Sequence, residues 1–127
     1  MYDDIADSSD GEAITFQEAY EQIEAVYRQV ADYHQYDIPE DYRRVFRIHI
    51  VGRGDGVFSI EFKDGHMEIH PNFDMPADAE IAASLDHLIG MAKGEVSADK
   101  LFLSGQLKVT GNIVKGAEMR RLLTMSM

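Results

Sequence analysis

The segment Ser104-Gly-Gln-Leu-Lys-Val-Thr-Gly-Asn112 alternates apolar and polar residues between two glycines. Its apolar members, Leu107 and Val109, share one face of an extended chain because side chains alternate along a strand. Asn112, which follows the second glycine, is a residue type that accepts hydrogen bonds from the first turn of a helix. The segment therefore predicts a short strand followed directly by a helix.

The residues before this segment predict two further helices. Ser84 and Ser97 stand where a helix can begin, since their hydroxyl groups can accept hydrogen bonds from unpaired N–H groups of the first turn. Gly94 and Gly105 stand where these helices can end, because glycine adopts the left-handed cap conformation without a steric cost. The expected order from residue 81 onward is strand, helix, short helix, strand and helix.

This succession resembles the sterol carrier protein 2 family. The resemblance rests on residues 80–84, on the helix pattern Leu88-Ile-x-Met-Ala-x-Gly94, on residues 97–102 and on Gly105-x-Leu-x-Val-x-Gly-Asn112. It implies an α+β domain with a mostly antiparallel sheet of about five strands. One face of this sheet is expected to be covered by helices that can enclose an apolar tunnel, with the last helix as one wall.

The N-terminal part of the chain divides into a tail and the start of a domain. Residues 1–13 are strongly acidic and are expected to be disordered, because such a segment cannot bury enough apolar surface to order itself. Residues 14–127 are expected to form a single domain. Thr15 and Glu18 form a capping box at the start of a helix, which Pro39 should end near Tyr36.

Three alternating segments, residues 45–52, 57–62 and 66–70, predict a β-meander. A glycine-rich connection separates the first two, and Asp64-Gly65 is a strong signal for a two-residue turn before the third. Residues 78–83, which are mostly small, predict a fourth strand. The apolar face of the meander contains Phe46, Ile48, Ile50, Phe58, Ile60, Phe62, Met67 and Ile69.

The composition excludes several classes of function. The chain has 127 residues, a formal net charge of −11 and no cysteine. The charge argues against nucleic acid as a partner, since binding to nucleic acid needs clustered Lys and Arg. No apolar run approaches the length of a membrane span, and no secretory signal is visible. We therefore expect a cytoplasmic protein with no stable membrane insertion, no disulfide and no thiolate metal site.

The family resemblance implies a lipid-binding or lipid-transfer protein, without catalytic activity or a cofactor, for a sterol-like, fatty acyl or isoprenoid ligand. Met and Leu side chains, which are not branched at Cβ, suit such a tunnel because they can repack around ligands of different shape. The last helix is expected to act as the gate of the tunnel. The residues expected to line it are Leu88, Met91, Phe102, Leu103, Val109, Met119, Leu122 and Leu123.

Two other readings of the sequence stay open beside the lipid carrier. The last helix, from Asn112, is apolar nearly all round, so it could instead dock on a partner enzyme or on a second copy of the chain, as a homodimer. A metal site is the other reading, because His66, Glu68 and His70 share one face of a strand. His49 and Glu61 could join them from neighbouring strands on the same face of the sheet.

We expect neither a metal nor a catalytic residue at these positions. Antiparallel sheets commonly keep one face solvated, and Arg47 and Lys63 on the same face would repel a cation. Ser84 and His87 are spaced three residues apart, as are Ser97 and Lys100, but both serines are better explained as helix caps.

Overall fold

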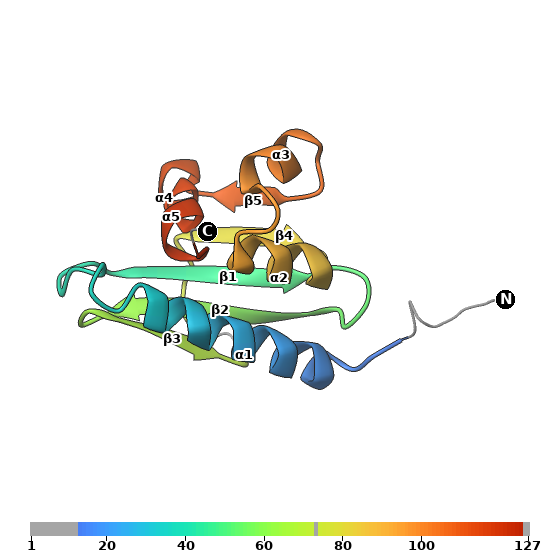
Figure 1. Cartoon of the computed structure of the whole chain (residues 1–127), viewed down its shortest axis with the longest axis horizontal. Helices are drawn as coiled ribbons and strands as arrows, with labels where there is room; N and C mark the ends of the chain where they lie inside the picture. The colour runs from blue at the N-terminus through green and yellow to red at the C-terminus, as the bar shows by residue number, and fades with distance from the viewer. Residues whose placement is uncertain (1–12, 73, 126–127) are drawn as a thin grey trace, which may run out of the picture.

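The computed structural model of the chain describes residues 13–72 and 74–125 (Figure 1). All but the last residue of the predicted acidic tail therefore lies outside the described residues. The described part contains five strands and five helices in the order α1 (Phe16–Tyr33), β1 (Arg44–Ile50), β2 (Gly56–Lys63), β3 (His66–His70), β4 (Ala79–Ala83), α2 (Leu85–Lys93), α3 (Ala98–Leu103), β5 (Lys108–Gly111), α4 (Ile113–Ala117) and α5 (Met119–Leu122).

The capping box predicted for the first helix is confirmed. The Glu18 backbone N–H donates to the Thr15 hydroxyl at 3.1 Å, and the Thr15 backbone N–H donates to the Glu18 carboxylate at 2.9 Å. Helix α1 ends at Tyr33, a little before the predicted end near Tyr36. Its buried face contains Ala19, Tyr20, Ile23, Val26, Tyr27 and Val30.

The five strands form one sheet in the order β3-β2-β1-β4-β5. Neighbouring strands are antiparallel except β1 and β4, which run parallel with Phe46 opposite Ala79. The predicted Asp64-Gly65 turn joins β2 to β3, and both residues have positive φ, 53° and 76°. Positive φ at both central residues is what the favoured two-residue hairpin turn requires. The mostly antiparallel α+β fold is therefore confirmed, with one parallel pair.

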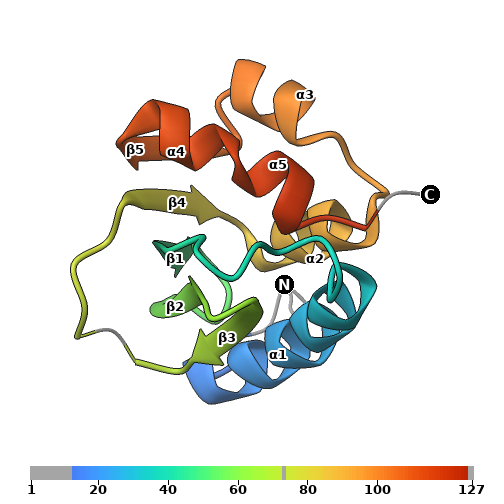
Figure 2. The same ribbon diagram turned by 90° about the vertical axis from the view of Figure 1, so that its left-hand side faces the viewer.

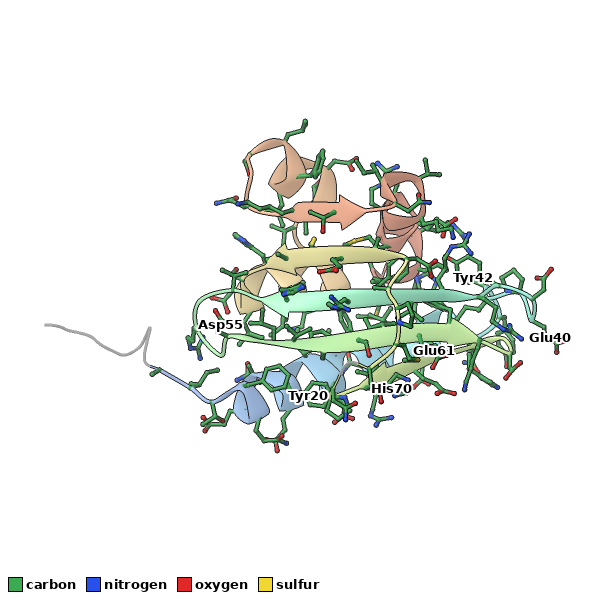
Figure 3. All side chains as sticks on the ribbon, turned by 180° about the vertical axis from the view of Figure 1, so that it is seen from behind. Tyr20, Glu40, Tyr42, Asp55, Glu61 and His70 are labelled. Atoms are coloured by element: carbon green, nitrogen blue, oxygen red, sulfur yellow. The ribbon has the colours of Figure 1, made fainter. Side chains whose placement is uncertain are left out.

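The parallel pair depends on a connection that crosses the open face of the sheet. The described residues of this connection, 71–72 and 74–78, lie over β2 and β1 between the end of β3 and the start of β4, which is on the far side of β1 (Figure 3). The Ser59 hydroxyl, which is fully buried, donates to the Asn72 carbonyl at 3.1 Å. At the end of the crossing, the Val45 backbone N–H donates to the Asp78 carboxylate at 2.9 Å. These bonds fix β4 beside β1.

The opposite face of the sheet carries the core. Helices α1 and α2 lie side by side against it (Figure 2). The predicted inward residues of β1 and β2 are all buried to 1% exposure or less: Phe46, Ile48, Ile50, Phe58, Ile60 and Phe62. The alternation of each strand therefore predicted correctly which face the helices cover.

The last helix differs from the prediction of one continuous element. It is broken at Glu118 into α4 and α5, where the hydrogen bonds tighten to a spacing of three residues: Glu118 N–H to Lys115 C=O and Arg121 N–H to Glu118 C=O, each at 3.1 Å. The break separates two kinds of surface. Ile113 and Val114 of α4 are exposed, whereas Met119 and Leu122 of α5 are buried.

Candidate functional site

An apolar pocket of about 180 Å³ lies between α3, β5, α4 and α5. Helix α3 and the segment entering β5 form one side of it, and the two pieces of the last helix form the other. Its charged lining residues are Asp99 and Arg120. The remaining lining residues are apolar: Ala98, Phe102, Leu107, Val109, Ile113, Gly116, Ala117 and Met119.

Local caps and turns hold the pocket walls in place. The Ser97 hydroxyl accepts from the Lys100 backbone N–H at 3.3 Å at the start of α3. At the end of α3, Gly105 takes φ of 81°, which lets the chain reverse into β5. Asn112 caps α4 by accepting from the Lys115 backbone N–H at 3.0 Å. The three caps predicted from the sequence, at Ser84, Ser97 and Asn112, are confirmed.

Gly116 allows α4 to lie directly against β5. A Cβ atom placed on Gly116 would come within 2.7 Å of the Val109 Cγ1 atom. Real Cβ contacts are not this short, so only glycine fits at this position without a shift of the neighbouring side chain. The closeness of α4 to β5 sets the size of the pocket, because Val109 and Gly116 both line it.

The break between α4 and α5 is anchored to the start of β1. The Glu118 carboxylate accepts from the Tyr42 hydroxyl at 2.5 Å and from Arg44 Nε at 2.8 Å. Burial alone would raise the pKa of the Glu118 carboxyl, but the hydrogen bonds from Arg44 and Tyr42 outweigh burial and lower this pKa. The pKa of the Tyr42 hydroxyl is raised by burial and by the same hydrogen bond. Glu118 therefore stays ionised and bound.

Further contacts hold the C-terminal segment against the rest of the domain. Lys115 Nζ lies 3.1 Å from the Asp78 carboxylate at the entry of β4. His34 Nε2, at the end of α1, lies 2.7 Å from the Thr124 carbonyl oxygen. The Met125 backbone N–H donates to the Ala92 carbonyl of α2 at 2.8 Å. The outer wall of the pocket is thus tied to α1, α2 and β4 as well as β1.

One ion pair joins the two sides of the pocket. Arg120 Nη1 of α5 lies 2.8 Å from the Asp99 carboxylate of α3, and both side chains are more than half exposed. An exposed pair of this kind contributes little to stability. It therefore restrains the walls only weakly, in contrast to the partly buried Glu118 anchor.

The structure separates the predicted lining residues into three groups. Phe102, Val109 and Met119 line the pocket. Leu103 is 83% exposed and does not line it. The other four residues are buried in the core that also contains Met119: Leu88, Met91, Leu122 and Leu123. A role in ligand binding stays a prediction for all eight.

The other seven pocket residues were not among those predicted to line it. Leu107 was predicted to share one face with Val109, so its place in the pocket lining could have been inferred together with that of Val109. Gly116 and Ala117 are small residues on one helix, and small side chains leave space beside a helix. Ile113 was recognised only as part of the apolar last helix.

The open face of the sheet brings part of the predicted metal set together. Among the described residues, ligand atoms of Glu61, Glu68 and His70 lie within 4.8 Å of one another. His70 Nε2 lies 3.1 Å from Glu61 and 3.8 Å from Glu68. His49 lies instead 3.0 Å from the Glu80 carboxylate. His70 is hydrogen-bonded to Glu61 and lies beside Glu68, which accounts for this grouping, and the expected absence of a metal stays a prediction.

Within residues 13–72 and 74–125, none of the helices combines the length and the apolar character that a membrane crossing would need.

Known proteins resemble this chain in sequence and in fold. A fatty acid-binding protein of Yarrowia lipolytica is 38% identical over 47 residues, which is 37% of this chain and 36% of that protein. Non-specific lipid-transfer protein-like 1 of Caenorhabditis elegans is 31% identical over 81 residues, which is 61% of this chain and 68% of that protein.

A solved structure shares the fold. Sterol carrier protein 2 of Aedes aegypti in complex with palmitate superimposes with a TM-score of 0.58 at 15% identity, over 80% of this chain and 94% of that one. The model of the SCP-2 sterol transfer family matches residues 21–124, which include the pocket and every strand. The chain therefore belongs to the SCP-2 sterol transfer family.

Proposed function

We propose that the chain is a lipid-binding or lipid-transfer protein that encloses a fatty acyl or similar apolar ligand between α3, β5 and the α4–α5 pair. The observation that carries the proposal is the apolar pocket, which lies within the family-matching residues. The relatives support the class of ligand, since one is named as a fatty acid-binding protein and another structure contains palmitate. Binding would be driven by removing apolar ligand surface from water.

The size of the pocket indicates that ligand binding requires it to open. Its volume is about 180 Å³, whereas sites for small molecules are typically about 300–1,000 Å³. The nearest route for expansion is inward past Met119, because Leu122 and Leu123 follow it along the same chain segment and share its core cluster. Ligand entry would then expose residues that were predicted to line the tunnel.

The α4–α5 pair is the wall best placed to move. Its break at Glu118 lies between an exposed helix and a buried one, and short helices joined at a break can shift relative to each other. Enclosure of a ligand in this way makes and breaks no covalent bond. We therefore propose a carrier that needs neither catalytic residues nor a cofactor. Its cytoplasmic location and its oligomeric state stay predictions.

The proposal can be tested by filling the pocket. Ala98 is half-buried and lines the pocket, so Ala98→Phe should occupy ligand space and lower the affinity for a fluorescent fatty acid by about tenfold or more, given about 0.8 kcal/mol for each displaced CH₂ group. Ala31→Phe is the matched control, because Ala31 is half-buried on α1 outside this pocket. Equal affinity in the two variants would contradict the proposed site.

A further inference from the structure

The lining of the pocket contains one cation and one anion, Arg120 of α5 and Asp99 of α3. Their side chains are 57% and 63% exposed. A side chain that lines the pocket and is also more than half exposed lies where the pocket meets solvent. The other lining residues are apolar, so these two groups are the charges that a ligand would meet as it enters.

The guanidinium of Arg120 has more hydrogen-bond donors than it uses. It carries five N–H donors in a planar fork that matches the shape of a carboxylate. Its Nη1 atom lies 2.8 Å from an Asp99 carboxylate oxygen, and within residues 13–72 and 74–125 Asp99 is its one hydrogen-bonding partner. Because an exposed pair contributes little to stability, a second carboxylate can replace Asp99 at this guanidinium at little cost.

We propose that Arg120 exchanges its partner when a ligand binds. The carboxylate head of an acyl ligand replaces the carboxylate of Asp99, while the acyl chain enters the apolar part of the pocket. Asp99 is exposed enough to turn into solvent when it is released. The exchange changes hydrogen bonds only, so the ligand leaves the pocket chemically unaltered. The class of ligand is an acyl chain with a free, ionised carboxylate.

The exchange connects the choice of ligand with the opening of the pocket. The Asp99–Arg120 pair joins α3 to α5 across the pocket, whose volume of about 180 Å³ has to increase for a ligand to fit. A carboxylate head breaks this link because it competes with Asp99 for the same donors. The hydroxyl head of an alcohol or a sterol is uncharged and competes poorly, so it leaves the link in place.

This inference rests on the proposed function, because it names the head group of the ligand that the same pocket encloses. The test compares two ligands with the same chain length, laurate and 1-dodecanol, at about pH 8, where a carboxylic acid is ionised. Their affinities for the full chain are measured by displacement of an uncharged fluorescent fatty alcohol. The two ligands differ in the charge of the head and share the apolar chain.

Laurate should respond in opposite directions to the loss of each partner. Arg120→Gln should lower the affinity for laurate by about fivefold or more, because the cation that binds the head is gone. Asp99→Asn should raise this affinity by about threefold, because the competing carboxylate is gone. Both substitutions break the link between α3 and α5, so the affinity for dodecanol should stay the same or rise in both variants.

Arg121→Gln is the matched control. It removes the same charge from the same helix, at an exposed position that does not line the pocket, and it should leave both affinities unchanged. All three substituted positions are exposed, so the fold should tolerate the changes. Opposite changes of the laurate affinity in Arg120→Gln and Asp99→Asn, with no change in Arg121→Gln, support the exchange.

Three results would overturn the exchange. One is an equal effect of Arg120→Gln on both ligands, or no effect on laurate, since Arg120 then does not bind the head. Another is a fall in laurate affinity in Asp99→Asn. The third is an equal loss of laurate affinity in Arg121→Gln, which would assign the effect to charge at long range. If the wild type binds both ligands and one of these results is found, only this inference fails, whereas the proposed function fails if the wild type binds neither ligand.

Discussion

The Glu118 carboxylate and the Arg44 guanidinium form an ion pair at 2.8 Å, which joins the break in the last helix to the first strand of the sheet. Arg44 Nη2 adds a second contact at 3.3 Å to the other carboxylate oxygen. Both side chains are less than one third exposed, so solvent screens the pair less than an exposed one. This contact holds the movable wall of the pocket to the sheet.

Replacing Glu118 by Gln should therefore destabilise the protein. The variant removes the charge that Arg44 and Tyr42 bind, and we expect the free energy of unfolding to fall by about 1–3 kcal/mol. Urea denaturation of both proteins measures the change. Asp99→Asn is the control, because its exposed pair with Arg120 should contribute less than about 1 kcal/mol. If the two variants lose equal free energy of unfolding, the contacts of Glu118 stabilise the protein no more than the exposed Asp99–Arg120 pair.

Stability should also depend on pH through Glu118 and Asp78. The pKa of the Asp78 carboxyl is lowered because hydrogen bonds from Val45 and Lys115 outweigh the effect of burial, and the pKa of Glu118 is lowered similarly. A carboxyl group with a lowered folded-state pKa contributes stability above its ordinary pKa, and this contribution is lost as the pH falls through the folded-state value.

The ordinary pKa values are 4.5 for Glu118 and 3.8 for Asp78, so the loss should begin near the first value and continue below the second. Urea midpoints measured at a series of pH values should show this fall in the wild type. The slope should be shallower in Glu118→Gln and in Asp78→Asn. If the curves of the wild type and the variants are parallel, Glu118 and Asp78 are not the source of the pH dependence.

Substitution of Gly116 tests the packing of α4 on β5. Alanine is intrinsically better than glycine in a helix by about 1 kcal/mol, yet the new Cβ would meet Val109 Cγ1 at 2.7 Å. We expect the steric cost to exceed the gain in helix propensity, so that Gly116→Ala lowers the free energy of unfolding by about 1–3 kcal/mol. The second substitution, Val109→Ala, should relieve the clash. The double mutant should therefore lose less free energy of unfolding than the two single mutants lose in sum. If the stability losses of the two single mutants simply add in the double mutant, the two side chains are not in direct contact.

Local patterns in the sequence predicted the elements well because each depended on neighbouring residues. Capping side chains marked the starts of α1, α2, α3 and α4, and alternation marked the buried faces of β1 and β2. The break between α4 and α5 was not predictable, because its main anchor is formed with Tyr42 and Arg44, far away in the sequence.

The pocket was harder to predict than the fold for a physical reason. A buried apolar residue has the same sequence pattern whether it fills a core or lines a cavity. Leu88 and Met91 therefore looked like candidate lining residues but are packed in the core, whereas Val109 does line the pocket. The distinction depends on how far apart α3 and α4 lie, which is decided by contacts between segments distant in the sequence.

Methyl NMR of the methionines during titration with palmitate shows whether the pocket encloses a lipid chain. Met119 is buried in the pocket wall, and Met67 lies on β3 outside this pocket. If it does, we expect a large, saturable shift of the Met119 methyl signal with little change at Met67. A Met119 signal that stays unchanged at saturating palmitate, or equal shifts at both residues, would contradict it.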